Sequence, residues 1–308
     1  MTPVRPPRLR PGARVALVAP AGPVDDERVQ RALENCGRLD VEPVLGEAAR
    51  RRMDYLAGRD EERARDLRDA LMDPSIDAVW ALRGGYGTMR TLAELRQLPP
   101  HSPKAYIGFS DNTAVHLALL RSGVVSFHGP HAGGEFPEFS ETALRRVLFH
   151  AEPAGMLPLD PDRDRPVTVR GGSAEGELSG GNLSLLASLI GTPWQPELRG
   201  RLLFVEEVAE SFYRIDRMFT QLRLAGVLEG VSGIVLGQFT ECCGDEPGRT
   251  IEDLFAELLE PPRVPVASGF PFGHVHNNWT LPLGVRARLD ADEGTLALLE
   301  AAVTQEAQ

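Results

Sequence analysis

The sequence predicts an α/β protein, with a parallel sheet covered by helices on both faces in the N-terminal half and a smaller mixed α/β domain in the C-terminal half. In the first half, short apolar runs alternate with amphipathic segments, as they do in βα repeats. Near the middle of the chain the composition changes, because prolines and aspartates gather there. A chain of 308 residues is also long enough for two domains.

Five apolar runs in the first half are expected to be buried strands, each separated from the next by a helix or a glycine-rich turn. The expected elements, in chain order, are a strand at 14–19, a helix at 25–36, a strand at 41–45, a helix at 60–72, a strand at 78–82, a helix at 88–95, a strand at 105–109, a helix at 114–120 and a strand at 124–127. Such a series favours a flavodoxin-like parallel sheet, in which a ligand site lies at the carboxyl ends of the strands.

Residues 1–151 are therefore assigned to the first domain, 152–172 to a proline-rich linker and 173–308 to the second domain. The second domain is expected to begin with a glycine-rich entry to a helix and to end with a hairpin. Its expected elements are a helix at 183–190, a strand at 202–206, helical spacing over 212–222, a strand at 233–239, a helix at 250–259 and hairpin strands at 285–289 and 295–299.

Composition restricts the classes of function. A formal charge of −11 argues against a nucleic-acid partner, which would need a basic face. Lys104 is the only lysine and no P-loop motif is present, so lysine-dependent chemistry has almost no candidate. Three cysteines, two of them adjacent, suit a reducing compartment. With no apolar run long enough for a signal peptide or a membrane span, we expect a soluble cytoplasmic protein with no membrane partner.

The segment around Ser110 is the most informative. An apolar run ends at Gly108-Phe-Ser-Asp111, and a helix-like run follows directly. This pattern places Ser110 on a tight strand-to-helix turn, which would expose its hydroxyl beside the first N–H groups of the helix. Alternatively, Ser110 or Asp111 simply caps the helix, since both residue types are favoured N-caps.

Two further side chains are candidates for the same chemistry. Glu206 ends an apolar strand, where a carboxylate is costly to bury unless it is paired, although it could equally be a surface or capping acid. His274 lies in a loop rich in glycine and proline, with no evident packing role. Together with His276 it could instead ligate a metal, but a third ligand with suitable spacing is not evident.

The loop Arg83-Gly-Gly-Tyr-Gly87 could be only a tight turn, yet glycines at the end of a strand also let a backbone N–H approach a ligand. It lacks the dinucleotide-binding pattern G-x-G-x-x-G, which weakens a Rossmann interpretation.

Several motifs in the chain resemble those of one family and occur in the same order. They are Val18-Ala-Pro20, Tyr55-Leu-Ala-Gly58 with Asp60-Glu-Glu-Arg63, Arg83-Gly-Gly-Tyr-Gly87, Gly108-Phe-Ser-Asp111, Phe127-His-Gly-Pro130, Gly180-Gly-Asn-Leu183, Leu203-Phe-Val-Glu-Glu207 with Tyr213-Arg-Ile-Asp-Arg217, and Gly273-His-Val275 with Leu281-Pro-Leu-Gly284. The chain resembles the serine LD-carboxypeptidases, which trim muropeptides, and their relatives the microcin-C self-immunity hydrolases.

The resemblance implies a Ser-His-Glu triad in an interdomain crevice. Ser110 would be the nucleophile, His274 the general base and Glu206 the acid that orients it, with an oxyanion hole at the N–H groups of Gly85 and Asp111. Glu-Asp is common in the family where this chain has two glutamates, which leaves the first acid unchanged.

The resemblance also implies a homodimer, with no metal and no cofactor. We expect Arg83 and Gly84 to contact the substrate, a small muropeptide, since arginine can hold a carboxylate by two parallel hydrogen bonds. Glu207 is expected to be dispensable for turnover, because neighbouring residues on a strand face opposite sides. His276 would share a face with His274 only on a regular strand, which Gly273 disfavours, so it is also expected to be dispensable.

Three functions remain open from the sequence. The first is an LD-carboxypeptidase that removes the terminal D-alanine of a murein tetrapeptide in peptidoglycan recycling. The second is a microcin-C-type hydrolase of aminoacyl-nucleotide bonds, and the third is a non-catalytic peptide-binding protein. A binding protein would gain nothing from retaining all three residues of a triad, which disfavours it.

Overall fold

The computed structural model describes residues 3–97, 103–260 and 263–305, and it divides into two compact units. The first unit comprises Met1–Pro153, Trp279–Gly284 and Ala301–Gln308, and the second comprises Ala154–Asn278 and Val285–Glu300. After leaving the first unit at residue 153, the chain thus returns to it twice. The sequence-based division into 1–151 and 173–308 contains no such returns.

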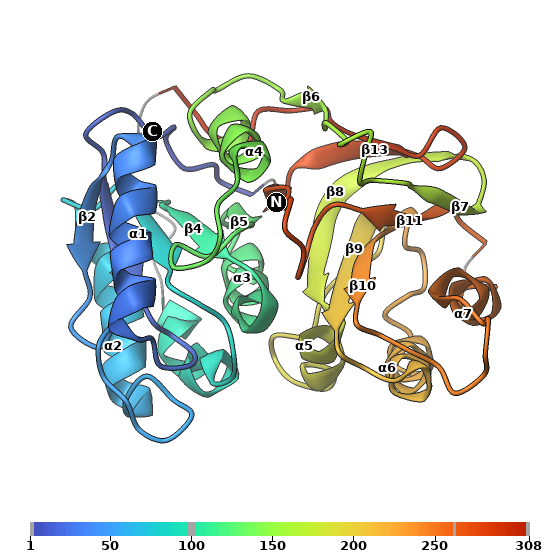
Figure 1. The fold of residues 1–308 in the computed structure, drawn as a ribbon, viewed down its shortest axis with the longest axis horizontal. Helices are drawn as coiled ribbons and strands as arrows, with labels where there is room; N and C mark the ends of the chain where they lie inside the picture. The colour runs from blue at the N-terminus through green and yellow to red at the C-terminus, as the bar shows by residue number, and fades with distance from the viewer. Residues whose placement is uncertain (1–2, 98–102, 261–262, 306–308) are drawn as a thin grey trace. The chain divides into compact units, whose positions relative to one another are not determined.

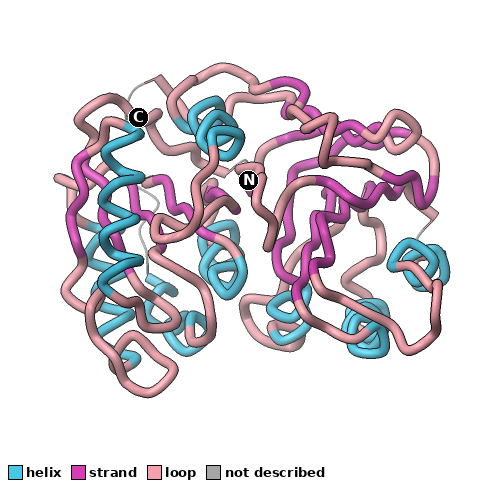
Figure 2. The backbone as a smooth tube through the Cα atoms, viewed as in Figure 1, coloured by secondary structure: helices cyan, strands magenta, loops and turns pink. Residues whose placement is uncertain are grey.

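The sheet of the first unit has six strands in the order β12-β5-β4-β3-β1-β2 (Figures 1 and 2). The strands are β1 (Arg14–Val18), β2 (Glu42–Leu45), β3 (Ala78–Ala81), β4 (Ala105–Gly108), β5 (Ser126–His128) and β12 (Leu281–Leu283). Strands β1 to β5 are parallel, and β12 is antiparallel to β5. The order 2-1-3-4-5 is that of a flavodoxin-like sheet, so the predicted fold class is confirmed.

Helices cover both faces of this sheet. They are α1 (Asp26–Leu39), α2 (Asp60–Met72), η1 (Thr88–Gln97), η2 (Ser110–Asn112), α3 (Thr113–Arg121) and α4 (Glu138–Leu148), where η denotes a 3₁₀ helix. Right-handed crossovers place α1 on one face and α2, η1 and α3 on the other. In agreement, α2 and α3 both contact η1, and Arg38 of α1 bonds Glu141 of α4 at 2.5 Å. The segment expected as a helix at 88–95 is a 3₁₀ helix.

The core of the first unit lies along its central strands. Every residue of β3 and β4 is buried, as expected for parallel strands that are covered on both faces. Trp80, Tyr106 and Phe127 are among the largest fully buried side chains. This core fixes the carboxyl ends of the strands, from which the functional loops project.

The second unit contains an eight-stranded mixed sheet in the order β6-β14-β13-β8-β9-β10-β11-β7. Its strands are β6 (Gly155–Met156), β7 (Val167–Arg170), β8 (Ser173–Asn182), β9 (Arg201–Val208), β10 (Gly233–Thr240), β11 (Val266–Phe270), β13 (Arg286–Asp290) and β14 (Thr295–Leu298), and its helices are α5 (Leu183–Ser188), α6 (Phe212–Leu224) and α7 (Ile251–Leu258). Strands β8 to β11 are parallel, and Figure 1 shows the three helices along one side of the sheet. The expected terminal hairpin is present as β13 and β14. Among the described residues of either unit, no helix has the length and hydropathy that a membrane span requires.

The segment 152–172, expected as a linker, contributes β6 and β7 to this second sheet. Both strands are short and lie at opposite ends of the strand order, where proline-rich sequence is tolerated because an edge strand leaves half of its N–H groups unpaired. The prolines thus mark sheet edges rather than a spacer between domains.

Candidate active site

Ser110 lies on a strained turn between β4 and α3. Strand β4 ends at Gly108, and Ser110 starts the 3₁₀ turn η2 with a left-handed φ of 61°. Such a conformation costs a non-glycine residue on the order of 1–2 kcal/mol and is concentrated at functional sites. The N-cap of α3 is Asn112, so the alternative that Ser110 or Asp111 caps this helix is wrong.

The loop after β3 packs directly against Ser110. A Cβ atom added to Gly84 would lie 3.0 Å from the Cβ and 3.2 Å from the Oγ of Ser110, closer than real Cβ contacts normally come. Gly85, beside it, is exposed and has a φ of 116°. Only a residue without a side chain allows this approach of the two loops.

Hydrogen bonds tie the two loops together. The buried Asp111 accepts the backbone N–H of Thr88 at 2.9 Å, and its carbonyl oxygen accepts the Thr88 hydroxyl at 2.5 Å. Asn112 accepts the Tyr106 hydroxyl at 2.5 Å and donates to the carbonyl of Arg83 at 3.3 Å. Burial raises the pKa of Asp111 despite its hydrogen bonds to Thr88, because removal from water disfavours the carboxylate. The two residues that follow Ser110 are therefore held by the loop after β3 and by Tyr106 of β4.

Arg63 of α2 holds the loops after β1 and β3 through hydrogen bonds to backbone carbonyl oxygens. The sequence did not predict this structural role. Its side chain is fully buried, and its guanidinium pairs with Asp60 at 2.6 Å. It also donates to the carbonyl oxygens of Gly87, at 3.0 Å, and of Pro20. A buried arginine bonded to two loop carbonyls joins the loops after β1 and β3. The signal in the sequence was the acid-to-arginine spacing of Asp60-Glu-Glu-Arg63.

Arg83, a candidate substrate ligand, is half-buried and bonded within the same region. Its Nε donates to the carbonyl of Gly84 at 3.1 Å, and its Nη1 donates to the carbonyl of Pro23 at 3.0 Å. These two bonds fix the position of the guanidinium beside Gly84.

In the second unit, His274 and Glu206 form a hydrogen-bonded pair. His274 Nδ1 lies 2.7 Å from Oε2 of Glu206, whose side chain is fully buried near the end of β9. The Glu206 carboxylate can only accept, so Nδ1 is the donor and the proton-accepting position of the neutral ring is Nε2. The reading of Glu206 as a surface or capping acid is wrong.

Gly273 allows this pair to form. Its φ is 104°, and a Cβ atom there would lie 2.6 Å from Oε2 and 2.7 Å from Cβ of Glu206. The loop is held by Asn278, which accepts the N–H of Gly273 at 3.2 Å and donates to its carbonyl at 3.0 Å. A glycine is thus needed next to His274 for both conformational and steric reasons.

The environment raises the pKa of His274. Burial alone would lower it, but the hydrogen bond and the negative charge of Glu206 outweigh burial, with a smaller contribution from Glu207. The imidazolium form is therefore stabilised, as required of a base that must hold a proton during a reaction cycle.

Glu207 has a different role from its neighbour. Alternation along β9 gives it separate partners: Asn182 Nδ2 at 2.9 Å, the N–H and hydroxyl of Ser184 at 2.8 and 2.6 Å, and the N–H of Val208 at 3.0 Å. It is only 3% exposed, so it is no ordinary surface acid. Its carboxylate joins β9 to the start of α5.

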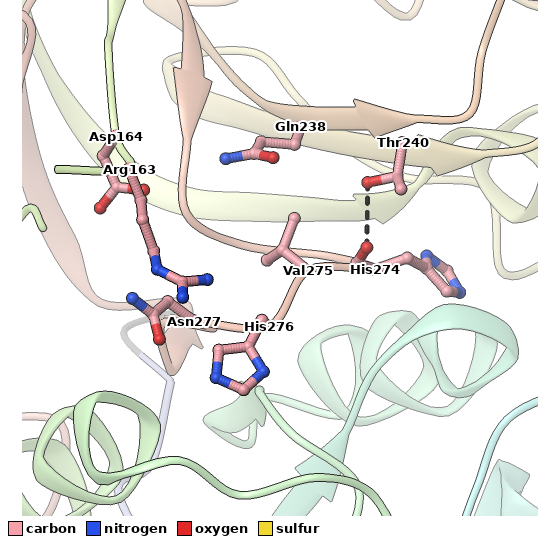
Figure 3. A pocket seen from close by; sticks show the side chains of 8 residues that line it. All are labelled: Arg163, Asp164, Gln238, Thr240, His274, Val275, His276 and Asn277. Carbon is pink, nitrogen blue, oxygen red and sulfur yellow. Dashed lines mark hydrogen bonds between the residues drawn. The ribbon is translucent and has the colours of Figure 1, made fainter.

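His274 and His276 do not converge on a common point. In Figure 3 the two imidazole rings point in different directions from the loop, and His276 is exposed. Within the ranges that the structure describes, no group of three His, Cys, Asp or Glu side chains is arranged to hold a metal ion.

The predicted residues thus fall into two groups, each ordered within its own unit. Ser110, Asp111 and the Gly84-Gly85 loop lie together in the first unit, whereas Glu206 and His274 lie together in the second. The first group offers a hydroxyl and backbone N–H groups, and the second offers a base paired with an acid.

Two family models match the chain. Residues 15–129 match an LD-carboxypeptidase N-terminal domain, and residues 175–289 match an LD-carboxypeptidase C-terminal domain.

Relatives that match over most of their length include proteins named as carboxypeptidases. The chain is 45% identical to SCO6489 of Streptomyces coelicolor, which is named provisionally as a carboxypeptidase, with 96% of each chain covered. It is 34% identical to the murein tetrapeptide carboxypeptidase of Pseudomonas aeruginosa, covering 91% of this chain and 94% of the relative. Identity to the microcin C7 self-immunity protein MccF of Escherichia coli is 27%, covering 92% and 91%.

Among solved structures, the muramoyltetrapeptide carboxypeptidase from Oxalobacter formigenes superposes with a TM-score of 0.80 at 33% identity. The match covers 93% of this chain and 98% of that one. It spans both units.

Proposed function

Because this chain belongs to the LD-carboxypeptidase family and is a serine-type hydrolase, we propose that it removes the terminal D-alanine from murein tetrapeptides. The bond cleaved would join the L-configured centre of the diamino acid to D-alanine. The observation that carries this proposal is the buried hydrogen bond between His274 and Glu206, in a chain whose Ser110 occupies a strained strand-to-helix turn.

In the proposed reaction, the Ser110 oxygen attacks the carbonyl carbon of the scissile amide while Nε2 of His274 takes the hydroxyl proton. Glu206 holds the ring by its Nδ1–H and stabilises the imidazolium that forms. The backbone N–H groups of Gly85 and Asp111 would donate to the negative oxygen of the tetrahedral intermediate.

Collapse of the intermediate breaks the C–N bond, and the departing amine of D-alanine takes the proton from His274. An ester between the tripeptide and Ser110 remains. Water then attacks this ester, with His274 again acting as the base, and releases the tripeptide while restoring the serine. Arg83, held beside Gly84, is our candidate to bind the terminal carboxylate of the substrate.

The test is release of D-alanine from a purified tetrapeptide. The wild type should release D-alanine, whereas Ser110→Ala, His274→Ala and Glu206→Gln should each reduce kcat by at least about 10³ while remaining folded. His276→Ala should keep most of the activity. A fluorophosphonate should label the wild type but not Ser110→Ala, which also separates an enzyme from a peptide-binding protein.

The same assay should include an aminoacyl sulfamoyl nucleotide, the class of substrate expected of a microcin-C-type hydrolase. Hydrolysis of that compound without any release of D-alanine would overturn the proposed substrate but keep the proposed triad. Failure of both reactions with the wild-type protein would overturn the triad as well.

We further expect a homodimer, which the resemblance to the family implies. We also expect it to act in cytoplasmic peptidoglycan recycling, since the substrate would be a small released muropeptide. Light scattering on the purified protein and fractionation of the producing cells test these two expectations separately.

A further inference from the structure

A buried histidine that the proposed reaction does not use lies against the turn of Ser110. His131 follows β5 in the chain and is 8% exposed. Its ring stacks on that of Phe109, with the ring centroids 4.2 Å apart and an angle of 27° between the planes. A Cβ atom added to Gly84 would lie 3.3 Å from Cε1 of His131 and 3.2 Å from Oγ of Ser110. The histidine ring and the proposed nucleophile therefore border the same small space within the first unit.

Three nitrogen atoms converge on the carbonyl oxygen of Phe109. Nε2 of His131 lies 3.1 Å from this oxygen, and Asn112 donates to it from its side-chain Nδ2 at 3.0 Å and from its backbone N–H at 3.2 Å. The oxygen belongs to the planar peptide unit that contains the nitrogen of Ser110. The three contacts thus fix the plane from which Ser110 turns into its left-handed φ of 61°.

The amide of Asn112 determines which ring nitrogen of His131 carries a hydrogen. Oδ1 of Asn112 accepts the hydroxyl of Tyr106 at 2.5 Å, so Nδ2 is on the opposite side of the amide. Nδ2 faces the carbonyl oxygens of Arg83 and Phe109 at 3.3 and 3.0 Å, which can only accept and which use both of its hydrogens. Nε2 of His131, 3.1 Å from Nδ2, therefore carries its own hydrogen and donates it to the carbonyl of Phe109.

A strained turn requires such contacts to persist. A serine in the left-handed region is stable only where its surroundings hold it there. With a hydrogen on Nδ1 instead, Nε2 of His131 would have to accept from Asn112, and one of the two carbonyl oxygens would lose the amide hydrogen that it accepts. Displacement of a reacting atom by about 1 Å can cost on the order of 100-fold in rate, so the hold on the Phe109 carbonyl bears directly on turnover.

We propose that His131 is a positioning residue for the nucleophile, whose Nε2–H holds Ser110 in its reactive turn through the carbonyl oxygen of Phe109. The inference rests on the proposed function, because it gives His131 a task in a reaction at Ser110. The imidazole of His131 takes no proton from the serine and contacts no substrate in this role. Two histidines then serve one nucleophile differently, His274 as its base and His131 as a donor to its backbone.

A matched pair of variants separates the hydrogen bond from the packing of the ring. His131→Leu fills a similar volume without a donor, whereas His131→Gln restores an N–H near the position of Nε2, and both lose the stacking on Phe109. His131→Leu should lower kcat for D-alanine release, and the rate at which a fluorophosphonate labels Ser110, about 10-fold, with KM changed less than about twofold. His131→Gln should recover both rates to within about threefold of the wild type. His150→Gln is the control, because it removes an exposed histidine ring from the first unit, and it should change neither rate.

Equal losses in His131→Leu and His131→Gln would assign the effect to ring packing and overturn the proposal, as would no loss in either. A measurement on the wild type is independent of how the variants fold: proton–nitrogen NMR correlations within the histidine rings should show a hydrogen on Nε2 of His131. A hydrogen on Nδ1 alone would also overturn the proposal. If the wild type neither released D-alanine nor was labelled at Ser110, the proposed function itself would fail, whereas the NMR result would still show whether His131 donates to Phe109.

Discussion

Two glycines, Gly84 and Gly273, lie so close to proposed catalytic residues that neither position has room for a side chain. Gly84 allows the loop after β3 to approach Ser110, and Gly273 allows His274 to reach Glu206. In both cases an added Cβ atom would meet a residue proposed to take part in catalysis. Substituting either glycine by alanine should therefore reduce kcat more than it reduces the free energy of unfolding.

Gly273→Ala should lower kcat by at least about 10², because its Cβ would displace the Glu206 carboxylate from His274. Steady-state kinetics on folded protein measures the effect. Gly191→Ala is the control: its φ of 79° is also left-handed, but nothing lies within 4 Å of the added Cβ. Equal activity of the two variants would show that the contact with Glu206 is unimportant.

The raised pKa of His274 predicts the acidic limb of the pH–rate profile. The base acts only when it is neutral, so kcat/KM should rise as pH increases through a pKa above the ordinary 6.5. In Glu206→Gln the stabilising charge is gone, and the limb should move toward lower pH at reduced activity. A limb at the same pH in both proteins would assign it to another group.

The same shift has a consequence for stability. Because the folded protein binds this proton more tightly than the unfolded chain does, the His274–Glu206 pair contributes most below pH 6.5. That contribution is lost as pH rises through the higher pKa of the folded state. The enzyme should thus gain activity in the pH range where this pair stabilises it least.

At the scale of elements, β9 carries two adjacent acids with separate tasks. Glu206 faces His274, and Glu207 bonds the first turn of α5. The alternation expected from the sequence explains this division. The burial of Glu207 could not be foreseen, because its partners Asn182 and Ser184 come from another strand and helix.

Glu207→Gln should therefore lower stability while the folded variant keeps most of its turnover. Loss of charge-assisted hydrogen bonds in a buried position should cost about 2 kcal/mol or more. Thermal unfolding and kcat measured on the same preparation would separate the two effects, with the exposed Glu229→Gln as a control. An unchanged Tm together with a large loss of kcat would instead place Glu207 in the catalytic machinery.

At the scale of the whole molecule, the sequence predicted the elements that bury regular apolar runs. Residues 60–72 were expected to be helical and form α2, and the turn that carries Ser110 follows β4 as expected. The shortest strands were not predicted. β12 has three residues and β6 has two, too few to show a periodic pattern of apolar residues. The sequence also did not predict the cavity that Arg163, Thr240 and His274 line, because these residues lie far apart in the chain.

The returns of the chain to the first unit predict that residues 1–153 alone are an incomplete fold. This fragment would lack β12, which pairs with β5, and Thr304, whose backbone bonds Arg8 and Pro6 at 2.8 and 2.9 Å. It should therefore show no cooperative thermal transition by circular dichroism, whereas the full chain should show one. A cooperative transition near that of the full chain would show that the missing segments are dispensable.

Strand β12 belongs to the sheet of the first unit but lies late in the sequence, and this affects how genes of the family can recombine. A crossover near codon 153 between two diverged relatives would join the first five strands of one parent to the β12 of the other. The paired strands β5 and β12 would then come from different parents, although each parental segment of the gene is itself unchanged. Functional chimaeras should be those in which residues 126–128 and 281–283 remain compatible, so these two stretches are expected to be inherited as one unit.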